Sequence, residues 1–230
     1  MTTSDMGALA RKSHTAAACM LTVPIASLLL ATAWLGPPAW KLVGLGAAGW
    51  IFALALRGPV ALLARWLTSP ERTRTILGWA SGPAEELVRV GMVILFVHTA
   101  TDATWAGIGW AGIEVITIAI NAFAIAVLLT RDGPKAQKVQ TFVRERDAMT
   151  TYGWAWGTVE RCSATAVHVG FTLLLFAQPW LVLATLVAHS LTNMSTVYFA
   201  KRSVAVVELA LLAVSSGIFL CGLLAASGVL

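Results

Sequence analysis

Charged residues are scarce in this sequence of 230 residues, because Asp, Glu, Lys and Arg together make up only 12% of it. Soluble domains carry about twice that share, and here the missing charge is absent from long blocks instead of being thinned evenly. Apolar residues make up 58%. A bilayer core about 30 Å thick needs about 20 apolar residues per helix, so this length allows about seven or eight spans and no separate soluble domain. The composition predicts a single integral membrane domain over residues 1–230.

Cysteine is also rare, and Cys19, Cys162 and Cys221 each lie in an apolar stretch. Their odd number and their positions indicate neither a disulfide framework nor a Cys-based metal site. The net charge of +5 would suggest nucleic acid as a partner of a soluble protein. In a membrane protein it reflects basic cytoplasmic loops, so we expect membrane lipids as partners and no nucleic acid.

Seven segments have the length and apolar character of membrane-crossing helices. We expect helices over Thr15–Gly36, Lys41–Leu67, Pro83–Thr101, Thr104–Thr130, Tyr152–Ala177, Pro179–Ala200 and Ser203–Val229. Gly and Pro mark several of the breaks between them. The run Arg57-Gly58-Pro59 predicts an interruption of the second helix, with the rest continuing along the membrane surface. The first segment resembles a signal peptide, but its length suits an uncleaved first helix.

Lys and Arg alternate with helix number along the chain. They precede the first helix and occupy the second, fourth and sixth connections, whereas the third and fifth connections and the C-terminus contain none. The positive-inside rule then predicts a cytoplasmic N-terminus and an external C-terminus for a seven-helix protein.

Ionisable side chains at membrane depth cost about 2.5–3.5 kcal/mol each, so each of them needs a reason. Four of the expected helices contain such groups or their amide partners: Glu85, Glu86 and Arg89; Glu114; Glu160, Arg161 and His168; His189 and Asn193. Glu85 and Arg89 share a helix face at i,i+4 spacing, which predicts an ion pair. His189 and Asn193 have the same spacing and can point at one substrate atom.

This set of residues is compatible with two kinds of hydrolytic chemistry. Two histidines and a glutamate can bind a zinc ion and leave one position for water. Alternatively, a glutamate and a histidine activate water as general base, while His189 and Asn193 donate hydrogen bonds to a developing oxyanion. The same groups could also merely tie helices together by hydrogen bonds.

The order of these motifs carries a family resemblance from Gly82 to Asn193. The motifs are Gly82-x-x-Glu85-Glu86-x-x-Arg89, then Gly107-Ile108-Gly109-Trp110-Ala111-Gly112-Ile113-Glu114, then Glu160-Arg161 with His168, then His189-x-x-x-Asn193. This order resembles the YhfC family of intramembrane metalloproteases and, more distantly, the CAAX prenyl protease and bacteriocin-processing superfamily. Trp110 stands where the glycine-rich motif of the YhfC family has histidine.

The resemblance implies roles for the matching positions. It implies that Glu85 and His168 activate water or bind a metal, with His189 and Asn193 as the partner pair. Glu85, His168 and His189 would be the ligands of a divalent metal such as zinc. The supporting residues would be Glu86, Arg89, Glu114 and Glu160.

We therefore expect an all-α bundle of about seven spans in a bacterial-type plasma membrane, with its site in residues 82–200. Its function would be hydrolysis of a peptide bond in a membrane-bound peptide or protein, at or near the cytoplasmic side. Two alternatives stay open. A proton-coupled small transporter also uses intramembrane Glu and His, and a catalytically inactive immunity or binding protein can keep the same fold.

Overall fold

The computed structural model describes residues 3–147, 153–199 and 203–229. Over these residues the chain is helical, with eight α-helices, one short 3-10 helix and no strand. The helices are α1 (Thr3–Leu35), α2 (Trp40–Leu67), α3 (Pro70–Phe96), α4 (Ala100–Leu129), α5 (Pro134–Asp147), α6 (Gly153–Ala177), η1 (Pro179–Leu181), α7 (Val182–Phe199) and α8 (Val204–Ala226). The expectation of an all-α fold is confirmed.

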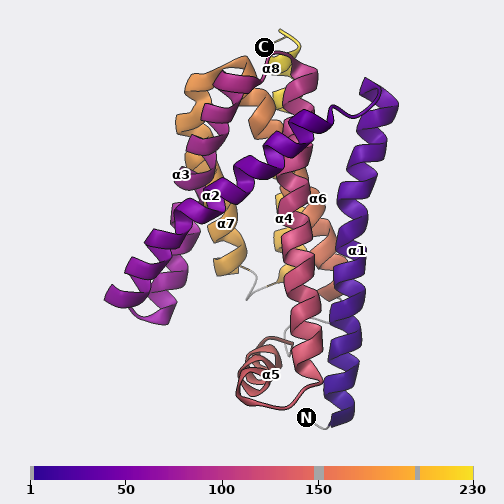
Figure 1. Cartoon of the computed structure of the whole chain (residues 1–230), viewed down its shortest axis with the longest axis vertical. Helices are drawn as coiled ribbons and strands as arrows, with labels where there is room; N and C mark the ends of the chain where they lie inside the picture. Colours follow the sequence, from indigo (N-terminus) through magenta and orange to yellow (C-terminus); the bar gives the residue numbers. More distant parts are fainter. Residues whose placement is uncertain (1–2, 148–152, 200–202, 230) are drawn as a thin grey trace.

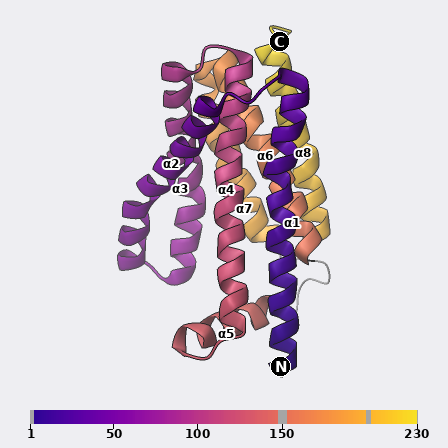
Figure 2. The same cartoon turned by 45° about the vertical axis from the view of Figure 1, so that its right-hand side comes forward.

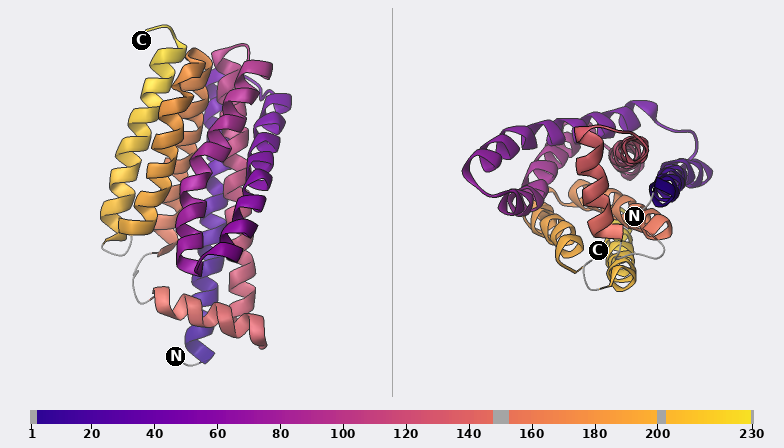
Figure 3. Two further views of the ribbon diagram at one scale, coloured as in Figure 1. Left: turned by 90° about the vertical axis from the view of Figure 1, so that its left-hand side faces the viewer. Right: turned by 90° about the horizontal axis from the view of Figure 1, so that it is seen from below.

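Most of the long helices run roughly along one bundle axis, while α2 is strongly tilted and α5 lies across the axis (Figure 3). Helix α4 stands near the middle and α1 at the right-hand edge, and α2 crosses in front of α4 at a steep angle (Figure 1). Helices α2 and α3 form one edge of the bundle (Figure 2). The beginning of α1 and the end of α8 lie at opposite ends of the molecule (Figure 1).

Five helices are long and apolar enough to cross a membrane, judged by length and composition: Asp5–Leu35, Trp40–Leu67, Ala100–Leu129, Ala155–Ala177 and Val204–Ala226. They indicate a membrane protein. Helices α3 and α7 do not belong to this set, and they contain the polar residues Glu85, Glu86, Arg89, His189 and Asn193.

The sequence misplaced the start of α3. That helix was expected at Pro83 but begins at Pro70, where Ser69 caps it by accepting a hydrogen bond from the backbone N–H of Arg72. Pro83 lies inside the helix, which membrane helices tolerate because neighbouring groups satisfy the freed carbonyl. The earlier start moves Glu85 from the expected helix end to the middle of α3.

The predicted interruption of the second helix is also wrong. Helix α2 continues through Arg57-Gly58-Pro59 to Leu67, with Pro59 in its interior. Arg57 is therefore a residue within a long helix and not part of a connection. Helix α5 was likewise unexpected, since its residues were assigned to a charged loop.

Glycines let three pairs of helices approach closely, as is common where membrane helices pack. A Cβ atom added to Gly109 of α4 would fall on the backbone of Val43 in α2, and one added to Gly82 of α3 would fall on Ser190 in α7. A Cβ atom on Gly170 of α6 would meet the backbone of Ile218 and Phe219 in α8 at 2.9 Å. The contact at Gly82 fixes α3 and α7, which both carry polar side chains, relative to each other.

Candidate active site

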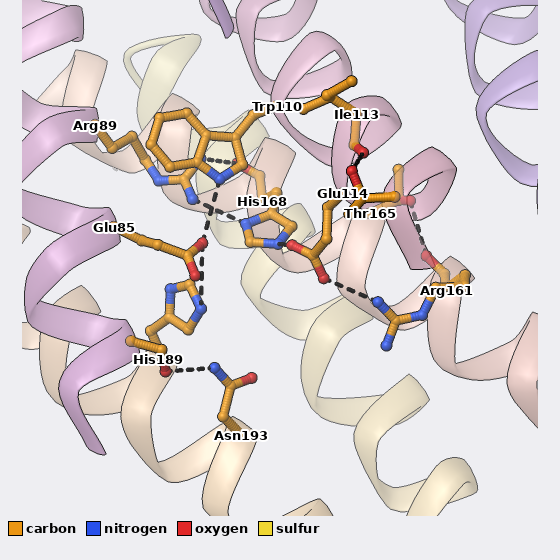
Figure 4. Close-up of polar contacts among 12 residues, drawn as sticks. Glu85, Arg89, Trp110, Ile113, Glu114, Arg161, Thr165, His168, His189 and Asn193 are labelled. Atoms are coloured by element: carbon orange, nitrogen blue, oxygen red, sulfur yellow. Dashed lines mark hydrogen bonds and ion pairs between the residues drawn. The ribbon is translucent and has the colours of Figure 1, made fainter. Parts of the chain in front are cut away.

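A cavity of about 210 Å³ lies inside the bundle and is lined by α2, α3, α4, α6, α7 and α8. Six of the eight residues predicted from sequence line it: Glu85, Glu114, Glu160, His168, His189 and Asn193. Glu86 and Arg89, the other two, are fully buried and bond to the histidines. The structure therefore brings side chains from four helices to one place (Figure 4).

Glu85 is a buried carboxylate with one partner on each oxygen. Its Oε1 atom lies 3.3 Å from Nη1 of Arg57, and its Oε2 atom accepts a hydrogen bond of 3.4 Å from the indole N–H of Trp110. The predicted ion pair between Glu85 and Arg89 is wrong, because Arg89 binds Glu86 instead. Adjacent helix residues point about 100° apart, so Glu85 lines the cavity while Glu86 faces the packed interior, where it meets Arg89.

Arg89 organises the buried side of the site. Its Nε atom lies 3.2 Å from both carboxylate oxygens of Glu86, and its Nη1 atom donates to Thr172 at 3.1 Å. The guanidinium carbon lies 4.1 Å from the ring centroid of Trp110, within cation–π range. Since Arg89 and Glu86 are both fully buried, their charges need all of these partners.

The ring of His189 is oriented by Glu86. Its Nδ1 atom lies 2.7 Å from Oε1 of Glu86. A carboxylate that also binds a guanidinium can only accept hydrogen bonds, so Nδ1 carries a hydrogen and the neutral ring has its lone pair on Nε2. That Nε2 atom lies 3.7 Å from Oε2 of Glu85, which exceeds a hydrogen bond and can be bridged by one water molecule.

His168 has a different protonation pattern. Its Nδ1 atom lies 2.8 Å from Nη2 of Arg89. Because arginine has only donors, Nδ1 accepts, and the ring hydrogen lies on Nε2, which donates to Oε2 of Glu114 at 2.7 Å. His168 is therefore a neutral ring between a guanidinium and a carboxylate.

Arg161 connects the two remaining acidic residues. It lies 2.8 Å from Glu114 and 2.7 Å from Glu160. Its Nε atom, the Ser163 hydroxyl and Oε2 of Glu208 are buried and have no hydrogen-bond partner in the described part of the chain. Arg161 and Ser163 both line the cavity. The side of the cavity next to α6 therefore has polar atoms that can still form hydrogen bonds.

Asn193 lies on the cavity wall one turn beyond His189, as its spacing predicted. Its amide Nδ2 donates to the hydroxyl of Ser81 at 2.7 Å. This bond ties α7 to α3 next to the site.

One carboxylate oxygen of Glu85 and one nitrogen each of His168 and His189 lie within 4.8 Å of one another, so this buried group could hold a metal ion. The hydrogen bonds oppose that use for His168. Its Nδ1 atom accepts from Arg89, and a metal on Nε2 would displace the only ring hydrogen and leave an imidazolate.

Two residues at the site, Arg57 and Trp110, were not among those expected. Arg57 was interpreted as a loop charge beside a helix break, although an arginine within an apolar run is itself a signal of a buried partner. Trp110 was noted only as a departure from a motif. Its contacts with Glu85 and Arg89 had no sequence signal, because they join helices that are distant in the chain.

Comparison of the chain with protein-family models, with curated proteins and with solved structures gave no match.

Proposed function

We propose that this chain is an intramembrane peptidase that uses a water molecule held between Glu85 and His189. The observation that carries the proposal is the 3.7 Å separation of the buried groups Glu85 Oε2 and His189 Nε2 on the wall of the cavity. Each group is fixed by further partners, so the pair is preorganised for one small ligand between them.

The proposed chemistry is general base catalysis by His189. Its Nε2 atom takes a proton from the water, and the hydroxide oxygen attacks the carbonyl carbon of the scissile peptide bond. Glu86 stabilises the imidazolium that forms, as an acidic residue does beside a catalytic histidine. The imidazolium then gives its proton to the leaving amine, and the C–N bond breaks.

Arg57 is placed to stabilise the oxyanion of this reaction. It lines the cavity and lies 3.3 Å from Glu85, and its side chain is one quarter exposed, so part of it faces the open space. A cation aimed at developing negative charge acts strongly in a site that excludes water. Glu85 then holds Arg57 and orients the attacking water, whereas His168 and Asn193 shape the wall.

A zinc mechanism is the second candidate, and it rests on the Glu85, His168 and His189 group. We do not favour it, because Arg89 holds His168 in the tautomer whose Nε2 carries hydrogen. Only Glu85 and His189 then offer free electron pairs, which is one ligand fewer than the three protein ligands of catalytic zinc sites.

The topology belongs to the same proposal. We infer seven spans in a bacterial-type plasma membrane, with α3 and α7 completing the five apolar helices and with the N-terminus in the cytoplasm. The alternation of basic residues supports this orientation. Polar faces on α3 and α7 are compatible with crossing the bilayer, because those faces turn inward to the cavity.

The test uses purified protein in liposomes with fluorescently labelled single-span peptides as candidate substrates. We expect cleavage by the wild-type chain and a rate lower by about 10²–10⁴ for Glu85→Gln or His189→Gln. Proton flux across the liposome membrane is measured in parallel, because the alternating acids and histidines would also suit a proton relay. Proton flux without peptide cleavage would contradict the peptidase proposal and would support a proton-coupled transporter instead.

A further inference from the structure

A second hollow of about 610 Å³ lies between α7 and α8. Its wall is almost wholly apolar. The hydroxyls of Thr192 and Ser195 do not change this character, since they donate to the carbonyl oxygens of Ala188 and Leu191 in their own helix, each at 2.8 Å. We call this hollow the α7–α8 groove.

The α7–α8 groove meets the polar cavity. Thr192, Leu211 and Val214 line both of them, so one wall is shared. At the outer side, Leu191 is 52% exposed and Val206 is 67% exposed. The apolar groove therefore reaches from the outer face of the bundle to the wall that it shares with the site.

Helix packing explains why a groove lies between α7 and α8. Helix α7 packs closely on α3 through Gly82, and α8 packs closely on α6 through Gly170. The groove separates these two tight pairs. The α7–α8 groove can therefore widen without breaking the close contact of α7 with α3 or of α8 with α6.

The cavity beyond the shared wall offers unused hydrogen-bonding atoms. Among the residues that the structure describes, the Arg161 Nε–H and the Ser163 hydroxyl are buried and have no hydrogen-bond partner, which costs free energy unless a ligand supplies one. Backbone groups of an extended polypeptide have free donors and acceptors. A helical segment has none to spare, because its amides already pair internally.

We propose that the α7–α8 groove is the path by which an extended apolar segment of a membrane polypeptide reaches the cavity. Its side chains lie along the groove, and its backbone pairs with Arg161 and Ser163. This inference rests on the proposed peptidase function and adds the route and the conformation of the substrate.

The test places a photo-crosslinking benzoylphenylalanine at Leu191, in the α7–α8 groove, or at Leu183 as the control. Leu183 lies on the same helix, is 74% exposed and does not line the groove. Both variants carry Glu85→Gln to prevent turnover and are reconstituted in liposomes. The probe is a synthetic single-span Leu/Ala peptide with a central Gly-Pro pair and a fluorophore at one end.

We expect peptide crosslinks at position 191 in about tenfold excess over position 183, and we expect excess unlabelled peptide to compete them away. Equal crosslinking at both positions, or crosslinks to lipid alone at position 191, would overturn the proposal. In the active background, Leu191→Trp should fill the groove and lower cleavage about tenfold, whereas Leu183→Trp should not.

The same experiment separates this inference from the peptidase proposal. If the peptide crosslinks specifically at position 191 but the wild-type chain does not cleave it, the α7–α8 groove binds the peptide and the peptidase proposal is wrong. If Leu191→Trp leaves the cleavage rate unchanged, the chain is a peptidase but the α7–α8 groove is not the path of its substrate.

Discussion

The Nε2 atom of His189 lies 3.7 Å from the Oε2 atom of Glu85, and neither group can turn freely. Glu86 holds the opposite nitrogen of the His189 ring, while Arg57 and Trp110 hold Glu85. These contacts join α2, α3, α4 and α7 around one small space. Such fixed polar pairs are costly inside a membrane and are typical of functional sites.

Glu85→Gln and His189→Gln should each lower peptide cleavage by about 10²–10⁴, because each removes a group that activates or orients water. Initial rates in liposomes check this, and His98→Gln is the control, since His98 is exposed at the end of α3. Cleavage at the wild-type rate by either variant would contradict the mechanism.

Arg89→Met should destabilise the fold by about 3–5 kcal/mol, because it leaves the buried Glu86 carboxylate without its cation. Arg74→Met, at an exposed position in the same helix, should change stability by about 0.5 kcal/mol or less. Denaturant unfolding in detergent measures both variants. Similar stability of the two would show that Arg89 does not hold the site together.

Gly82→Ala should force α7 away from α3, because the new Cβ atom would fall on Ser190 and the carbonyl of Leu186. We expect a loss of about 1–3 kcal/mol in stability and a loss of cleavage as His189 moves with α7. Gly91→Ala is the control in the same helix, where a Cβ atom meets nothing within 4 Å. If both alanine variants cleave equally well, close packing of α3 on α7 does not position the site.

Chelation should leave cleavage unchanged, because the proposed water is activated by His189 and not by a metal. The rate is measured after treatment with a chelator and again after zinc is added, and the metal content is determined by mass spectrometry. Loss of cleavage that zinc restores would instead support the group Glu85, His168 and His189 as ligands.

Sequence alone identified most of the site because charge is rare in this chain. Glu85, His168 and His189 stood out against apolar surroundings, and their cost in a membrane implied a shared purpose. Spacing on one helix was less informative. Glu85 and Arg89 have the spacing of an ion pair, yet Arg89 binds Glu86, because the choice between two neighbouring carboxylates depends on what packs on each face.

Helix boundaries show the same limit. Pro59 and Pro83 predicted a break and a helix start, but both lie inside helices, where the surrounding bundle compensates for the missing hydrogen bond. The rules that place helix ends at proline consider one stretch of chain in water. They do not include neighbouring helices, whose groups can supply hydrogen bonds to the carbonyl that proline leaves free.

The amino-acid sequence by itself determined that the protein is helical and apolar, and which few polar side chains are buried within it. It could do so because length and hydropathy act on each segment separately. Only the tertiary structure decided that Arg57 and Trp110 hold Glu85, that His168 faces Glu114, and that a groove between α7 and α8 meets the cavity. Those relationships depend on how separate helices pack, and the rotation of one helix against another is not encoded in any single stretch of the chain.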